Sequence, residues 1–150
     1  MAVRLNDDSV IDFIRLRTEL MKELGEITDE KDIAEFENAT EKYFLSHINS
    51  DLFCWGIFAE NRLAAAGSLC LFERLPYKEN PEGKEGYILN IYTCTEYRGC
   101  GFAGEILDDI INFSRENGIK RLWLNSSEKG KKLYAEKGFG ENKNEMEIYL

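Results

Sequence analysis

Arg98-Gly99-Cys100-Gly101-Phe102-Ala103-Gly104 decides the fold, because it joins a run of strand-forming residues to an amphipathic helix. Glycine at three of these positions lets the backbone approach a ligand closely and adopt positive φ angles. The first amides of the helix have no partners within the helix, and the positive end of its dipole lies at the same point. We therefore expect an anion to bind here, and we interpret the turn as a cradle for a diphosphate.

The same glycines also match the G-x-G-x-x-G pattern of a dinucleotide-binding fold. That fold requires an acidic residue about 20 positions after the glycines, within a longer α/β domain. Here Asn125, Ser126 and Ser127 occupy that region, and only one further helix and strand are expected before residue 150. The context therefore argues against a dinucleotide fold.

Composition predicts a single globular domain over residues 1–150. The formal charge of −9 argues against a nucleic-acid partner and is compatible with a cationic substrate such as an amine. No apolar run approaches the ~20 residues that span a bilayer, and residues 1–8 do not resemble a signal peptide, so we expect a cytoplasmic protein without a membrane partner. The four cysteines have no C-x-x-C spacing and there is one histidine, which favours free thiols over a metal site.

The order of elements predicts a mixed α/β sheet between helices. Helical periodicity predicts one helix after residue 9 and another after residue 29. The strand-like runs 52–59 and 63–72 flank a tight turn at Glu60-Asn61 and predict a hairpin. The near-continuous apolar character of these strands indicates a sheet covered on both faces. After the glycine turn come a helix ending at Asn117-Gly118, a buried strand at 122–124 and a last helix, and we expect residues 145–150 to return as an edge strand.

Two motifs resemble the GNAT superfamily of acyl-CoA-dependent N-acyltransferases. Arg98, Gly101 and Ala103 satisfy its pyrophosphate-loop pattern. The segment from Ser127 to Phe139 is similar to a second family segment, whose core is Leu-Tyr, three residues, then Gly-Phe. The resemblance covers residues 87–146. It implies a twisted mixed sheet of six to seven strands, helices on both faces, and fourth and fifth strands that splay apart.

The resemblance also implies the ligand and its binding residues. Acetyl-CoA would be the cosubstrate, with no metal, and its pantetheine arm would lie along Ile91, Tyr92 and Thr93, one of whose amides would stabilise an oxyanion. The expected diphosphate-binding residues are Arg98, Gly99, Cys100, Gly101, Phe102, Ala103 and Gly104, with Ser127 as a further contact. The first two helices would form much of the wall that binds the acceptor.

The implied reaction is N-acetylation of a primary amine, in a small molecule or a peptide, by direct attack in a ternary complex. Tyr134 matches the family's general acid, although a helix tyrosine packed against the sheet would show the same periodicity. Some members carry a Glu that acts as the catalytic base at the position of Tyr87. Here Glu73, Glu35 or a chain of waters would instead accept the proton of the amine. The alternative is a non-catalytic acyl-CoA-binding regulatory module. The resemblance also allows a homodimer.

Overall fold

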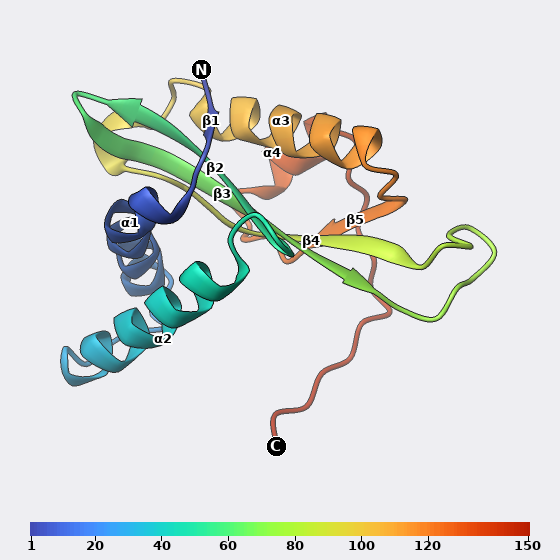
Figure 1. The fold of residues 1–150 in the computed structure, drawn as a ribbon, viewed down its shortest axis with the longest axis horizontal. Coiled ribbons are helices and arrows are strands. Elements are labelled where there is room, and N and C mark those ends of the chain that lie inside the picture. Colours follow the sequence, from blue (N-terminus) through green and yellow to red (C-terminus); the bar gives the residue numbers. More distant parts are fainter.

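The computed structural model describes residues 1–150 and has helices on both faces of a mixed sheet (Figure 1). The α-helices begin and end close to the predicted caps. For example, the Asp29 carboxylate accepts a hydrogen bond from the amide of Lys31, where the second helix begins. The elements are β1 (Val3–Arg4), η1 (Asp7–Ser9), α1 (Val10–Glu23), α2 (Lys31–His47), β2 (Leu52–Ala59), β3 (Arg62–Glu73), β4 (Lys84–Thr93), η2 (Thr95–Tyr97), α3 (Phe102–Glu116), β5 (Arg121–Leu124) and α4 (Lys131–Glu136).

The sheet contains five strands in the order β1-β2-β3-β4-β5, against the six to seven expected. Neighbouring strands are antiparallel except β4 and β5, which are parallel because α3 crosses between them. The β2–β3 hairpin turns at Glu60 and Asn61 with φ angles of 50° and 62°, so both residues are in the left-handed region that such a turn requires.

Two apolar clusters hold the helices against the sheet. On one face, α1 and α2 pack Phe13, Leu16 and Phe44 onto side chains of β2, β3 and β4. On the other face, Ile106, Leu107 and Ile110 of α3 pack onto the same strands, and α4 joins this layer through Leu133 and Tyr134. The predicted covering of both faces is confirmed, and Figure 1 shows the two helical layers on either side of the sheet.

A β-bulge interrupts β4 at Asn90, whose φ angle is 58°. Ala66 faces Tyr92 and Ser68 faces Leu89, so β4 has one more residue than β3 across this step. On its other side, β4 pairs with β5 only from Glu85 to Ile88. β5 ends at Leu124, opposite Ile88, so residues 89–93 of β4 have no strand partner on that side.

The chain beyond α4 does not form the edge strand expected at residues 145–150. This segment has no regular secondary structure and extends away from the body of the molecule (Figure 1). A strand needs a partner edge, and here the tail does not pair with the free edge of β5. No helix in the structure is both long and apolar enough to cross a membrane.

Candidate active site at the open end of β4

The glycine turn presents a run of unpaired backbone amides in front of α3. The amides of residues 99–104 donate no hydrogen bond within the protein, and the amide of Glu105 is the first to bond back, to the carbonyl of Gly101. Gly99 and Gly101 have φ angles of 80° and 83°, and a Cβ atom built on either would meet no heavy atom within 4 Å. The turn therefore combines free donors, open space and the positive end of a 15-residue helix, which is the arrangement that binds a phosphate group.

Arg98 is held beside the turn by two hydrogen bonds. Its Nε donates to the carbonyl oxygen of Thr93 at 3.1 Å, and its Nη2 donates to the Glu23 carboxylate at 2.5 Å. This bond to the guanidinium lowers the pKa of the Glu23 carboxyl group below its usual value. Arg98 thus links the end of β4 and the end of α1 to the turn, while its exposed side chain stays accessible to an anion.

Tyr134 lies on α4, on the same side of the sheet as α3. Its ring packs against Phe139, with centroids 6.0 Å apart, and its side chain is one of those packed on the α3-side cluster. Burial raises the pKa of the Tyr134 phenol above its ordinary value of 10.0, so the group carries its proton throughout the neutral range. A phenol held in this state is suited to donate a proton.

The ring of Tyr134 needs a glycine beneath it. A Cβ atom on Gly130 would lie 2.9 Å from Cε2 of that ring. The Ser127 hydroxyl accepts a hydrogen bond from the Gly130 amide at 3.3 Å, which fixes the turn that enters α4. Ser127 is exposed, follows β5 and lies four residues before α4, the helix that carries Tyr134.

The structure does not bring Glu73 to the open end of β4. Glu73 faces Lys84 at the opposite end of this strand, seven residues from Ile91, which corresponds to roughly 23 Å along a strand. Glu35 is exposed on α2. No carboxylate lies on β4 between Ile88 and Thr93, so this stretch of the strand supplies no base, and the base remains a prediction.

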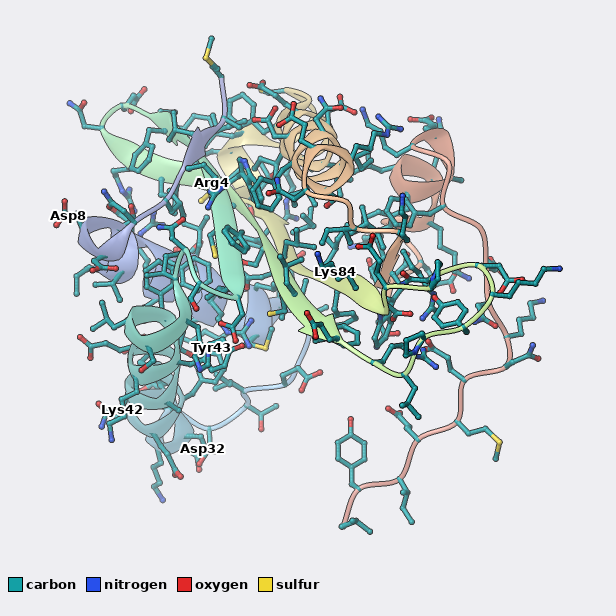
Figure 2. The ribbon with its side chains drawn as sticks, turned by 45° about the vertical axis from the view of Figure 1, so that its right-hand side comes forward. Arg4, Asp8, Asp32, Lys42, Tyr43 and Lys84 are labelled. Carbon is teal, nitrogen blue, oxygen red and sulfur yellow. The ribbon has the colours of Figure 1, made fainter.

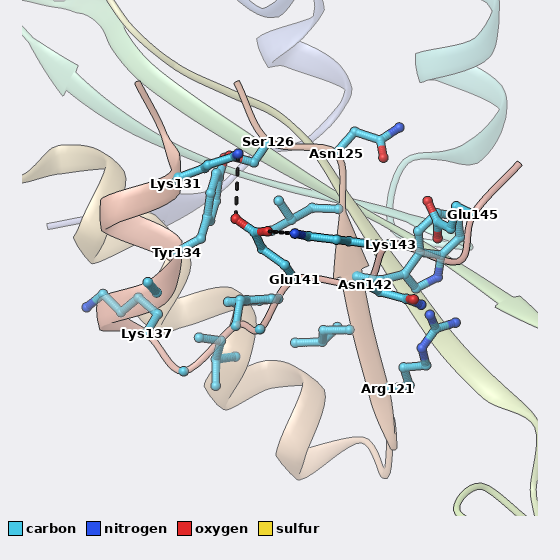
Figure 3. Close-up of a pocket in the computed structure, with 18 residues that line it drawn as sticks. Arg121, Asn125, Ser126, Lys131, Tyr134, Lys137, Glu141, Asn142, Lys143 and Glu145 are labelled. Carbon is cyan, nitrogen blue, oxygen red and sulfur yellow. Dashed lines mark ion pairs between the residues drawn. The ribbon is translucent and has the colours of Figure 1, made fainter. Parts of the chain in front are cut away.

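One large pocket does not coincide with the glycine turn. It has a volume of about 750 Å³ and lies between the free edge of β5, α4 and residues 137–145 (Figure 3). Figure 3 shows Glu141 between Lys131 and Lys143, with ion pairs to both, and Tyr134 on the wall. Because none of residues 98–104 lines it, we interpret this pocket as the groove left open where the tail departs from the sheet edge.

A second pocket of about 240 Å³ lies on the opposite face, between α1, α2 and the sheet, and reaches the bulge of β4. Tyr43 of α2, labelled in Figure 2, lines it and places its hydroxyl 3.9 Å from the Sγ atom of Cys70 on β3. Arg17 of α1 and Asn90 of β4 meet there, with Nη1 of Arg17 donating to Oδ1 of Asn90 at 3.2 Å. The sequence analysis did not single out this pair, although Arg17 stands within the apolar stripe of its helix and Asn90 interrupts an apolar strand.

Comparisons with known proteins agree with this geometry. A family model described as "Acetyltransferase (GNAT) family" matches residues 13–140. A search of curated proteins finds no match. The fold is shared with a predicted acetyltransferase from Clostridium acetobutylicum solved with acetyl-CoA (TM-score 0.86, 23% identity, 99% of this chain and 95% of that one).

Two other solved structures have the same fold. A GCN5-related N-acetyltransferase from Ralstonia eutropha superposes with a TM-score of 0.87 at 24% identity, over 100% of this chain and 97% of that one. A ribosomal-protein-alanine N-acetyltransferase from Brucella melitensis superposes with a TM-score of 0.76 at 17% identity, over 100% of this chain and 98% of that one. With a family model that matches residues 13–140, five strands, covering helices and a glycine turn before α3, this chain belongs to the GNAT family of acetyltransferases.

Proposed function

We propose that this protein is an N-acetyltransferase that moves the acetyl group of acetyl-CoA to a primary amine by direct attack in a ternary complex. One observation carries the proposal: the unpaired amides of residues 99–104 follow the end of β4 at which residues 89–93 have no partner in β5. The turn would hold the diphosphate of the cosubstrate. The unpaired stretch of β4 at Ile91, Tyr92 and Thr93 would hold the pantetheine arm as an added strand would be held.

The chemistry requires a proton to leave the amine and another to reach the departing thiolate. An aliphatic amine with an ordinary pKa near 10.4 must lose a proton before its nitrogen can attack the thioester carbonyl. As the C–N bond forms, a backbone amide of β4 stabilises the negative oxygen. The C–S bond then breaks, and the buried phenol of Tyr134 gives its proton to the sulfur. The second proton that the attacking nitrogen loses as it becomes an amide restores the phenol. In the absence of a carboxylate on this stretch of β4, we assign the amine proton to solvent water.

The experiment is a free-thiol release assay with acetyl-CoA across a panel of primary amines, together with calorimetry of acetyl-CoA alone. We expect saturable binding and turnover with at least one amine. A protein that binds acetyl-CoA but acetylates no acceptor would be the non-catalytic module instead. Absence of binding at millimolar acetyl-CoA would contradict both functions.

We further propose that the protein is a cytoplasmic homodimer formed by its tail. Met146 and Ile148 are 98% and 81% exposed, and the segment that carries them leaves its own body, while β5 remains an edge strand (Figure 1). An exposed apolar strand sequence and an open sheet edge complement each other. We therefore infer that residues 145–150 of one copy pair with β5 of a second copy and close the groove beside Tyr134. Light scattering of the purified protein tests this arrangement.

A further inference from the structure

The pocket between α1, α2 and the bulge of β4 contains a guanidinium group without a carboxylate partner. Arg17 forms no ion pair in the structure. By contrast, nine ion pairs join another arginine, a lysine or the N-terminus to a carboxylate at 3.5 Å or less. Its single hydrogen bond goes to Asn90, and its guanidinium carbon lies 5.4 Å from the centre of the Phe36 ring. Burial lowers the pKa of Arg17, yet an arginine keeps its charge. Four of its five N–H donors therefore have no protein acceptor.

Asn90 adds a second set of free donors to the same pocket. Because a guanidinium can only donate, the oxygen of the Asn90 amide must face Arg17, which directs Nδ2 elsewhere. That nitrogen is buried and has no hydrogen-bond partner, and the residue as a whole is only 7% exposed. Most buried polar atoms are hydrogen-bonded, so an orphaned buried donor beside an unpaired guanidinium marks a site for an acceptor group.

The surroundings specify the chemistry of that acceptor group. A planar group with two negatively charged oxygens fits the fork of an arginine. The rest of the wall is mainly apolar, with Phe13, Phe36 and Leu52 among its residues, and Arg17 is the only cation that lines it. One cation within an apolar wall suits a singly charged carboxylate better than a doubly charged phosphate, whose second charge would be left without a partner.

The position of the pocket connects this group to the proposed reaction. Leu89 and Asn90 line the pocket, and they directly precede Ile91–Thr93, the unpaired stretch of β4. The bulge places both of these consecutive side chains in the pocket, where a regular strand would turn one of them away. A molecule seated here would therefore lie beside the strand on which the acetyl group is expected.

We propose that Arg17 and Asn90 bind the carboxylate of the acceptor, and that the acceptor is an amino acid with an apolar side chain. The proposal rests on the proposed N-acetyltransferase function and adds the class of its substrate. Such an acceptor is a zwitterion with no net charge, so the overall charge of −9 does not repel it as it would repel a simple carboxylate anion.

The test compares leucine, methionine and phenylalanine with their carboxamides, which keep the amine and the side chain but lose the negative charge. Thiol release is measured with the natural protein and with Arg17→Gln, Arg17→Lys and Arg115→Gln. The last variant removes an arginine from α3, on the other face of the sheet, and is the matched control for charge. We expect Arg17→Gln to raise KM for the acids about tenfold to a hundredfold while it leaves the carboxamides unchanged.

Arg17→Lys should recover only part of the affinity for the acids, because it restores the charge without the planar fork. An equal effect of Arg17→Gln on acids and carboxamides would show that Arg17 is structural and would overturn the proposal. If the protein acetylates other amines and turns over the amino acids and their carboxamides equally well, the proposal is also overturned, while the proposed function stands.

A binding experiment decides the proposal even if no amine is acetylated. N-acetyl-leucine and its carboxamide are titrated by calorimetry into the protein in the presence of coenzyme A. We expect the acid to bind more tightly than the carboxamide, and Arg17→Gln to abolish this difference. Equal binding of the two ligands to the natural protein would overturn the proposal, whereas failure of turnover alone would count against the proposed function.

Discussion

Gly101→Ala separates the folding of the glycine turn from its capacity to bind coenzyme A. Gly101 has a φ angle of 83°, and a methyl group added there would touch no protein atom within 4 Å. The stability cost therefore comes from the backbone alone and should be about 1–2 kcal/mol, the cost of a left-handed conformation for a residue with a Cβ atom. For a chain of 150 residues this corresponds to a fall in Tm of roughly 2–8 °C.

The effect on binding should be larger than the effect on folding. In the proposed complex the added methyl group would occupy the space that the diphosphate needs. Forcing an extra carbon into a packed contact typically costs about 1–3 kcal/mol, which corresponds to a loss of affinity of about 5- to 150-fold. Calorimetry with coenzyme A measures this loss, and thermal unfolding of the same sample measures the stability.

Gly118→Ala is the matched control for this substitution. Gly118 also has a positive φ angle, 70°, and a Cβ atom there would also meet nothing within 4 Å. It follows α3 at the end opposite to Gly101, and the 15 residues of that helix separate the two glycines by roughly 22 Å. Gly118→Ala should lose a similar amount of stability and keep its affinity for coenzyme A. Equal affinities of the two folded variants would refute the assignment of the turn to the diphosphate.

Three further predictions concern Tyr134 as the proposed general acid, Gly130 beneath its ring, and the tail of residues 145–150. Tyr134→Phe should lower kcat by about 10²- to 10⁴-fold in the thiol-release assay and leave the affinity for acetyl-CoA unchanged; an equal loss of affinity would make Tyr134 structural. Because burial raises the Tyr134 pKa, the natural enzyme should lose activity only above pH 10, and the variant should lack this alkaline limb. Gly130→Ala, whose Cβ would lie 2.9 Å from the Tyr134 ring, should lower kcat, whereas Gly140→Ala, where a Cβ meets nothing within 4 Å, should not; equal rates would show that the ring tolerates displacement. Ile148→Glu in the exposed tail should convert the proposed dimer to a monomer in light scattering, with Glu147→Gln as the control, and a persistent dimer would place the interface elsewhere.

The glycine turn and the hairpin could be predicted because local chemistry determines both. Positive φ angles at Gly99, Gly101 and Asn61 follow from residue types that tolerate the left-handed region. The tail could not be predicted in the same way. Its alternating pattern describes a strand, but whether that strand pairs with its own sheet depends on the competing edges available, which the local pattern does not encode. The position of Glu73 could not be predicted for a similar reason, since only the register of β3 against β4 places it far from Ile91.

The pocket of Arg17 shows a different limit of sequence reasoning. Each residue carries a local signal, since a charged residue in an apolar helical stripe and an asparagine in an apolar strand both break the pattern around them. Their meaning depends on the contact between positions 17 and 90, which only the fold creates.

The bulge at Asn90 connects the two halves of the proposed site. Asparagine is among the few residues that adopt the left-handed conformation readily, so one residue type satisfies the backbone of the bulge and supplies an amide to the pocket. The extra residue shifts the register of β4 against β3 next to the point where the pairing with β5 ends, and it also turns Leu89 and Asn90 together toward α1 and α2. The same irregularity therefore accompanies the opening of the strand edge for the cosubstrate and forms the wall against which the acceptor would lie. A residue that served only the backbone, such as glycine, would keep the opening and lose the amide that Arg17 orients.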